Sequence, residues 1–267
     1  MDERGQRRLV RVPVERDLTV YVDRREVVTL MTLGAHPEWL VLGWLLHQNL
    51  INSVAEIESV SVDWEVAAAA VHTRQGDPIA SRIDRRRIIT SGCGQGSMFA
   101  DVVDRIAPVG RDFPPLRHSE LLEIVDAVRT HDTLYKSAGS VHACALFDGA
   151  RLQIFIEDVG RHNALDSIAG WRAMLPQPAV SSGIGLTLGQ AACPVLYTTG
   201  RLTSEMIIKS AQMGIPVAVS RSGTTELAID MATRLGICTI GRALNRRFLC
   251  YTHAWRLSLE SSGSEVS

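Results

Sequence analysis

The sharpest candidate for chemistry is a cysteine between two glycines, Cys93, in the stretch Thr90-Ser-Gly-Cys-Gly-Gln-Gly-Ser97. Flanking glycines suit a mobile or tightly turned loop in which a thiol reaches outward and another molecule comes close. The positive charge of nearby arginines favours the thiolate, the nucleophilic form of cysteine. The arginines ahead of the loop are Arg82, Arg85, Arg86 and Arg87. The pattern indicates a nucleophilic cysteine, and a surface loop that merely contains a cysteine stays open as the alternative.

The other cysteines lie in apolar, strand-like runs, where small core residues are the expected role. They are Cys144, Cys193, Cys238 and Cys250. Five cysteines with scattered spacing do not form a disulfide framework, so a reducing compartment is expected. No paired Cys-x-x-Cys or His-x-x-x-His spacing occurs, so the sequence predicts no bound metal.

Three polar turns, each with a glycine and an arginine, follow strand-like runs and lead into helices. They lie within 157–166, 198–206 and 220–225. Open α/β sheets bind ligands at the carboxyl ends of strands, and helix N-terminal amides attract anions. The turns therefore predict a rim that binds phosphate or nucleotide, although Asp158 and Arg161 could simply bridge each other. Neither a Walker A motif nor a Gly-x-Ser-x-Gly elbow occurs, which argues against P-loop nucleoside triphosphatases and α/β-hydrolases.

Hydrophobic patterning divides the chain into two structured parts, between a loose arm at 1–16 and a flexible tail at 259–267. The first part, 17–112, is predicted to be a small β-rich α+β unit that includes the Cys93 loop. Strands are expected at 18–22, at 27–33, within 60–71 and at 83–90. The one helix begins at Pro37 and has an apolar face formed by Trp39, Leu42, Leu45 and Leu46.

The second part, 113–258, follows a proline-rich break and alternates strands with helices. Its first helix is expected to be capped by Ser119, and a hairpin is expected around Asp148-Gly149. Helices are predicted at 163–173, 203–212 and 224–235, and strands at 194–197, 215–220 and 237–240. This alternation predicts a mainly parallel sheet with helices packed against it.

Overall composition excludes several classes of protein. Apolar residues make up 46% and charged residues 21%, so global disorder is not expected. A net charge of -1 gives no reason to expect nucleic-acid binding. No apolar run approaches the roughly 20 residues that span a bilayer, so no membrane association is predicted. The first residues lack the layout of a secretory signal, and a cytoplasmic location is expected.

Six stretches, in the same order, resemble the FdhD/NarQ family of formate dehydrogenase accessory sulfurtransferases. They are 90–94, 141–143, 157–166, 200–206, 214–222 and 251–253. The resemblance runs from Leu18 to about Arg256. It implies an α/β fold: a cytidine deaminase-like three-layer domain with a mainly parallel sheet, plus the smaller N-terminal β-rich part.

The resemblance also implies a function. Family members accept sulfur as a persulfide from a cysteine desulfurase of the IscS type. They pass it to molybdenum bis(molybdopterin guanine dinucleotide), Mo-bis-MGD, before this cargo enters the catalytic subunit of formate dehydrogenase. By this resemblance Cys93 is the sulfur acceptor, and no permanently bound metal is expected. The cofactor-contacting segment maps onto Arg242, Ala243, Leu244, Asn245, Arg246 and Arg247. The resemblance does not decide whether the protein forms a homodimer.

The chain departs from the family pattern at several positions. Gly96 replaces the second cysteine of a Cys-Gly-x-Cys loop, so no partner thiol within that loop can resolve a persulfide. Ser167 stands where lysine is common, and Gly223-Thr-Thr225 replaces Ala-Pro-Thr. A paralogue for another molybdoenzyme and a non-catalytic cofactor chaperone remain alternatives. A zinc deaminase is excluded because the nearest stretch, His142-Ala-Cys144, has no glutamate and no Cys-x-x-Cys occurs.

Overall fold

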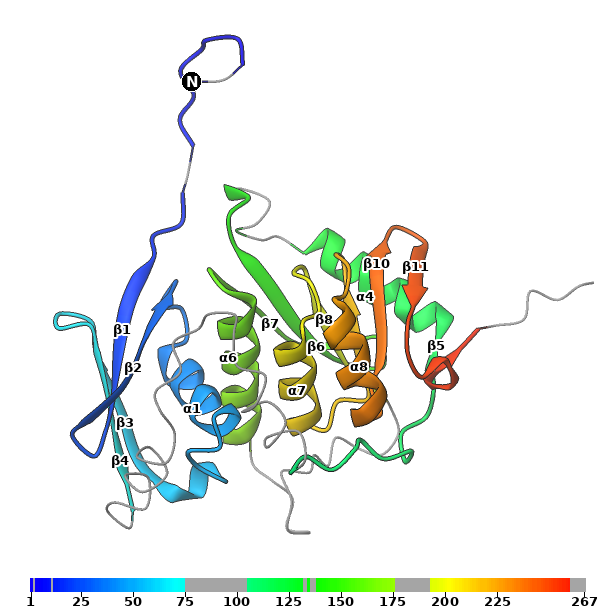
Figure 1. The fold of residues 1–267 in the computed structure, drawn as a ribbon. Coiled ribbons are helices and arrows are strands. Elements are labelled where there is room, and N and C mark those ends of the chain that lie inside the picture. The colour runs from blue at the N-terminus through cyan, green and yellow to red at the C-terminus, as the bar shows by residue number, and fades with distance from the viewer. Residues whose placement is uncertain are drawn as a thin grey trace, which may run out of the picture.

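The computed structural model describes residues 1, 3–10, 12–74, 105–131, 134, 138–175 and 193–259 (Figure 1). The loop with Cys93, the strand predicted at 83–90 and most of the predicted tail lie outside these residues.

The N-terminal part is a four-stranded sheet covered by one helix. The strands, in the spatial order β2-β1-β4-β3, are β1 (Arg16–Val22), β2 (Arg25–Thr32), β3 (Ile57–Asp63) and β4 (Ala68–Thr73). Helix α1 (Pro37–His47) packs on this sheet, and a short 3-10 helix, η1 (Val54–Glu56), precedes β3. The predicted hairpin is confirmed: β1 and β2 pair antiparallel, and Asp23 and Arg24 turn the chain with positive φ.

A six-stranded sheet forms the centre of the second part, with its strands in the order β11-β10-β9-β8-β6-β7. The strands are β6 (His142–Asp148), β7 (Arg151–Asp158), β8 (Pro194–Thr198), β9 (Val217–Ser220), β10 (Cys238–Leu244) and β11 (Arg247–Cys250). Strands β8, β9 and β10 pair in parallel. Since β6 is antiparallel to both β7 and β8, β7 runs in the same direction as β8.

The expectation of a mainly parallel sheet is therefore only partly right. Strands β7, β8, β9 and β10 share one direction, but only two of the five neighbouring pairs are parallel. The β6–β7 hairpin places β6 between β7 and β8, and β11 folds back on β10. The sheet is mixed because both of its outer connections are hairpins, which always pair antiparallel.

Helices cover both faces of this sheet, in the three-layer arrangement predicted. Helix α4 (His118–Thr130) lies on one face, and α6 (Arg161–Met174), α7 (Ser204–Gln212) and α8 (Glu226–Leu235) lie on the other (Figure 1). Alternate strand residues serve the two faces: Phe147 packs with the α4 core, and Leu146 packs with the α6 core. The two-stranded sheet of β5 (Leu116–Arg117) and β12 (Leu257–Ser258) and the 3-10 helix η2 (Ala254–Arg256) complete the described elements.

Two helix starts differ from the prediction. Ser119 lies inside α4 rather than at its cap, because Glu120 reaches back and accepts the backbone N–H of Arg117 at 2.9 Å. Asn163 lies inside α6, whose N-cap is Gly160. Its side chain instead donates hydrogen bonds to Asp158 and to the backbone of β2.

Helices α1 and α6 cross closely and join the two sheets. A Cβ on Gly170 would stand 1.9 Å from the carbonyl oxygen of Trp39, and one on Gly43 would stand 1.7 Å from that of Asp166. Backbone therefore contacts backbone at this crossing, which only glycine permits. Helix α1 is consequently buried on more than the predicted face, including Leu40 and Val41.

Candidate functional site

The carboxyl ends of β7, β8, β9 and β10 lie along one edge of the six-stranded sheet, and each leads into a polar turn (Figure 1). We call these turns the rim; they comprise residues 158–163, 198–203, 220–225 and 241–247. The first three lead into α6, α7 and α8, whose N-terminal amides therefore lie at this edge. The arrangement agrees with the sequence prediction of successive strand-end turns.

Hydrogen bonds connect the second, third and fourth rim turns in a row. Ser220 Oγ donates to the carbonyl oxygen of Gly200 at 2.6 Å, and Ser222 Oγ donates to that of Thr199 at 3.0 Å. The backbone N–H of Arg242 then donates to the carbonyl oxygen of Ser222 at 2.6 Å. The hydroxyls that the sequence placed in these turns thus hold one turn to the next, which makes the rim a pre-organised surface.

The first turn is attached to the N-terminal part through Asp158. Its carboxylate accepts a hydrogen bond from Thr32 Oγ1 at 2.5 Å and another from Asn163 Nδ2 at 3.2 Å. Asn163 Nδ2 also donates to the carbonyl oxygen of Met31 at 2.6 Å. Burial raises the pKa of Asp158, although these hydrogen bonds oppose the shift. Both carboxylate oxygens are thus used in joining the end of β2 to the rim.

His142 lies where the first and second turns meet. A Cβ on Gly200 would stand 2.7 Å from Arg161 Cδ and 3.3 Å from His142 Nδ1, so only glycine leaves room for both side chains. Burial, followed by the charge of Arg161, lowers the pKa of His142, which is therefore neutral at pH 7. Within the described part of the chain, its Nδ1 is buried and has no hydrogen-bond partner. The sequence marked Val141-His-Ala143 only as a family stretch and assigned His142 no role.

The predicted cofactor segment forms the hairpin between β10 and β11. Its first three residues extend β10 beyond the predicted end, and Arg247 begins β11. The pairing register shifts between Gly241 and Leu244, and Arg242 has a φ of 53° at this bulge. The exposed residues of the segment are Arg242, Leu244, Asn245, Arg246 and Arg247. Ala243 is only 1% exposed and belongs to the core, so its side chain cannot contact a ligand.

A row of ionisable side chains runs from the rim into the interior. His162 Nε2 lies 3.5 Å from Glu205, and Lys209 Nζ lies 3.2 Å from Glu205 and 2.9 Å from Asp166. His47 Nδ1 lies 2.5 Å from Asp166 Oδ1. The row connects α6, α7 and α1, and it reaches the buried interface between the two parts of the molecule.

The protonation states of this row follow from burial and pairing. Burial lowers the pKa of His47, and it lowers the pKa of His162 to about 4, so both imidazoles are neutral at pH 7. Burial opposes ionisation of Asp166, but Lys209 and His47 hold its pKa below the usual value. The pKa of Lys209 is raised by Asp166 and Glu205 against the effect of burial. A charged Lys209–Asp166 pair therefore lies inside the protein, and the sequence analysis missed it. The spacing of Glu205 and Lys209, four residues apart on one helix, signals only their own pair and not the contact with Asp166.

The four described cysteines do not share one environment. Cys144, Cys193 and Cys238 are buried, and burial raises the pKa of both Cys144 and Cys193 to about 12. Cys250 was expected to be a core residue, but it is half-buried on the edge strand β11. A hydrogen bond from Cys238 lowers the pKa of Cys250 to about 7.

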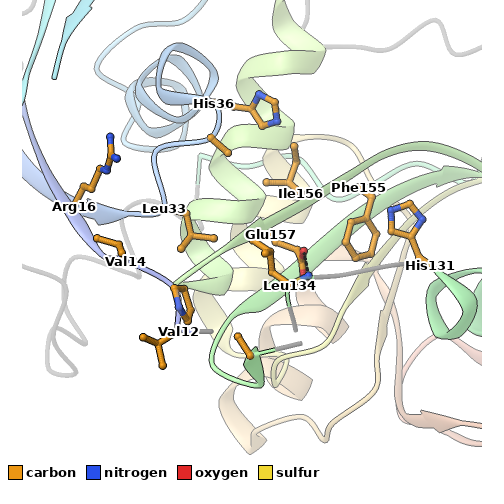
Figure 2. Close-up of a pocket in the computed structure, with 13 residues that line it drawn as sticks. Val12, Val14, Arg16, Leu33, His36, His131, Leu134, Phe155, Ile156 and Glu157 are labelled. Atoms are coloured by element: carbon orange, nitrogen blue, oxygen red, sulfur yellow. Dashed lines mark hydrogen bonds between the residues drawn. The ribbon is translucent and has the colours of Figure 1, made fainter. Parts of the chain in front are cut away.

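A cavity of about 710 Å³ lies beside the end of β7, where the two sheets approach each other (Figure 2). Phe155 and Glu157 of β7 line it together with the residues that follow β2 and α4. The rings of His131 and Phe155 are 4.4 Å apart, and Glu157 accepts the backbone N–H of Leu134 at 2.7 Å. A cavity of this size suits one small organic ligand. The sequence did not predict it, because four distant segments form its walls: residues at the start of β1, after β2, after α4 and in β7.

The described ranges contain no group of three or more His, Cys, Asp or Glu side chains that could hold a metal ion. None of their helices is both long enough and apolar enough to span a bilayer.

Comparison with known proteins identifies the family. A family model described as FdhD/NarQ matches residues 13–258. A sulfur carrier protein FdhD from Bacillus licheniformis is 32% identical over 241 residues, covering 90% of this chain and 87% of that protein. The protein of the same name from Bacillus subtilis is 30% identical over 248 residues, covering 92% and 90%. The crystal structure of a proposed formate dehydrogenase accessory protein from Desulfotalea psychrophila has a TM-score of 0.70 and 26% identity, covering 92% and 90%. The chain therefore belongs to the FdhD/NarQ family.

Proposed function

We propose that this chain is a sulfurtransferase, a sulfur carrier that serves formate dehydrogenase from the cytoplasm. Its relatives are named sulfur carrier proteins, and the similar crystal structure is described as a formate dehydrogenase accessory protein. Membership of the family over residues 13–258 supports the transfer of this role. The family's cytidine deaminase-like description of the fold remains an expectation.

Cys93 carries the sulfur in this proposal. Its thiolate attacks the outer sulfur of the persulfide on an IscS-type cysteine desulfurase, the S–S bond breaks, and the desulfurase cysteine leaves as a thiolate. The observation that carries the assignment is the burial of Cys144, Cys193 and Cys238, since a buried, protonated thiol cannot attack a partner's persulfide. Cys93, which lies outside the described residues, and the half-buried Cys250 are then the two candidates, and the glycines around Cys93 favour it.

The second substrate in the proposal is the molybdenum cofactor, Mo-bis-MGD, as cargo. Its guanine dinucleotide portion would lie against the rim, where the N-termini of α6, α7 and α8 supply amides for pyrophosphate oxygens. The last rim turn exposes Arg242, Arg246 and Arg247, and their guanidinium groups can form paired hydrogen bonds with phosphate. The cavity beside β7 is the alternative place for a heteroaromatic ring. Sulfur passes from Cys93 to the cofactor before it enters the catalytic subunit of formate dehydrogenase.

Loading by a desulfurase tests the cysteine assignment. The full chain is incubated with a cysteine desulfurase and cysteine, and intact mass is measured for wild type, Cys93→Ala and Cys250→Ala. Wild type and Cys250→Ala should gain one sulfur, and Cys93→Ala should gain none. Cys144→Ala should load like wild type and lose only some stability, since one small buried side chain is shortened.

Other outcomes separate the alternatives. Full loading of Cys93→Ala with none on Cys250→Ala would transfer the role to Cys250. If neither wild type nor any variant gains sulfur and guanine nucleotides still bind, the chain is a cofactor-binding chaperone rather than a sulfurtransferase.

A further inference from the structure

Cys238 and Cys250 form a pair of thiols on neighbouring strands. Their Sγ atoms are 3.7 Å apart, although the residues are 12 positions apart in the sequence. Cys250 is paired with Ile240 in the register of β10 and β11, so Cys238 is its diagonal neighbour. Cys238 belongs to the core cluster on the α4 side of the sheet, and Cys250 packs against the same cluster. The two side chains therefore lie on the same face of the sheet.

The two thiols differ in accessibility and in acidity. Cys238 is fully buried, whereas Cys250 is half-buried and can be reached by a small reagent. The hydrogen bond from Cys238 lowers the pKa of Cys250 to about 7, while that bond and burial raise the pKa of Cys238. An accessible thiolate beside a protected thiol is the arrangement in which one cysteine reacts with an oxidant and the other resolves the product.

We propose that Cys238 and Cys250 form a reversible disulfide when the protein meets a peroxide. The Cys250 thiolate attacks one peroxide oxygen, the O–O bond breaks, and Cys250 becomes a sulfenic acid while hydroxide takes up a proton and leaves as water. The Cys238 sulfur then attacks Cys250 Sγ, the S–O bond breaks, and a second water leaves with the proton of Cys238. In sum, two thiols are oxidised to one disulfide and one hydrogen peroxide is reduced to two waters.

The position of the pair makes this disulfide reducible. Diagonal neighbours in an antiparallel pair have Cα atoms about 7–8 Å apart. Disulfides usually span about 4.4–6.8 Å between Cα atoms, so the hairpin must close slightly to form the bond. The resulting strain raises the reduction potential, and an ordinary dithiol reductant should reopen the bridge.

The bridge would close a ring around the turn that carries Arg242 and Arg247. It ties the start of β10 to the end of β11, and the edge strand β11 then cannot separate from β10. The disulfide is independent of the proposed sulfur transfer, because neither cysteine is the proposed acceptor, Cys93.

Peptide mass spectrometry after oxidation tests the proposal. Wild type and Cys93→Ala are treated with hydrogen peroxide, free thiols are alkylated under denaturing conditions, and the digest is analysed. Both proteins should yield a cross-linked peptide containing Cys238 and Cys250, lighter by two hydrogens than the separate peptides. A dithiol reductant should remove the cross-link. The buried Cys144 and Cys193 serve as internal controls and should remain alkylatable.

A Cys238→Ser variant provides the second measurement. Without the resolving thiol, Cys250 should proceed to sulfinic acid under peroxide levels that leave wild type as the reversible disulfide. The proposal is overturned if wild-type Cys250 stays alkylatable after oxidation, or becomes sulfinic acid without the cross-link. A cross-link from Cys250 to Cys93 would overturn it equally. The wild-type arm decides these points even if the variant fails to fold.

Discussion

Replacing Lys209 by methionine should destabilise the protein strongly, because it leaves Asp166 as a buried carboxylate without its cation. The side chains of Lys209 and Asp166 are only 4% and 1% exposed, and Nζ lies 2.9 Å from Asp166 Oδ1. At this distance and an effective dielectric constant of about 20, their attraction is about 6 kcal/mol. Part of it offsets the desolvation of both charges, and breaking such buried pairs costs about 3–5 kcal/mol. Lys209→Met should therefore lower the free energy of unfolding by about 3–5 kcal/mol at pH 8.

The stability that Lys209→Met loses should depend on pH. In wild type the pKa of Asp166 is lowered, so the pair stabilises the fold above the unfolded-state pKa, and this contribution is lost as pH falls through the folded-state pKa. In Lys209→Met the pKa of the His47–Asp166 pair rises, because a proton is then the available neutralising charge. The variant should therefore be closer to wild type at pH 5.5 than at pH 8.

Urea denaturation followed by circular dichroism at the two pH values measures both effects. The matched control is Arg129→Met, which removes the cation of an exposed Arg129–Asp126 pair at 3.1 Å and should cost under about 1 kcal/mol. The double variant Asp166→Asn/Lys209→Met should recover part of the loss, since no buried charge is then left unpaired. The reasoning is refuted if Lys209→Met costs no more than Arg129→Met at pH 8, or if its cost is the same at both pH values.

Three other outcomes are expected. Gly170→Ala should lower the unfolding free energy by about 2 kcal/mol or more, because the added methyl group meets the Trp39 carbonyl oxygen. Gly223→Ala is the control in the same denaturation assay, since its added Cβ would meet no atom of the described residues within 4 Å. Calorimetry should show that GDP binds more tightly than ADP. Arg246→Ala and Arg247→Ala should each weaken GDP binding about ten- to a hundredfold. Equal binding of both nucleotides would place the site elsewhere. Elemental analysis of protein purified without chelator should show well under one zinc per chain, whereas stoichiometric zinc would contradict the exclusion of a metal site.

Local sequence determined most of the elements and the position of the rim. In the second part, the strands and helices between 141 and 240 lie within a few residues of their predicted bounds. The reason is that local chemistry ends each element: Gly149 and Gly236 take positive φ, at the β6–β7 turn and after α8. Because a polar turn must follow each buried strand, the rim could be located from the order of residues alone.

Tertiary structure decided which of these elements became neighbours. Hydrophobic periodicity says which face of a strand is buried, but it does not say that β6 lies between β7 and β8. It likewise could not bring Lys209 to Asp166 or Cys238 to Cys250, since these contacts join separate elements. The pKa values of Lys209 and Cys250 depend on burial and on the nearest charge or donor, and both are properties of the packed molecule. The sequence thus specified which groups could react, and packing decided which of them are charged, buried or paired.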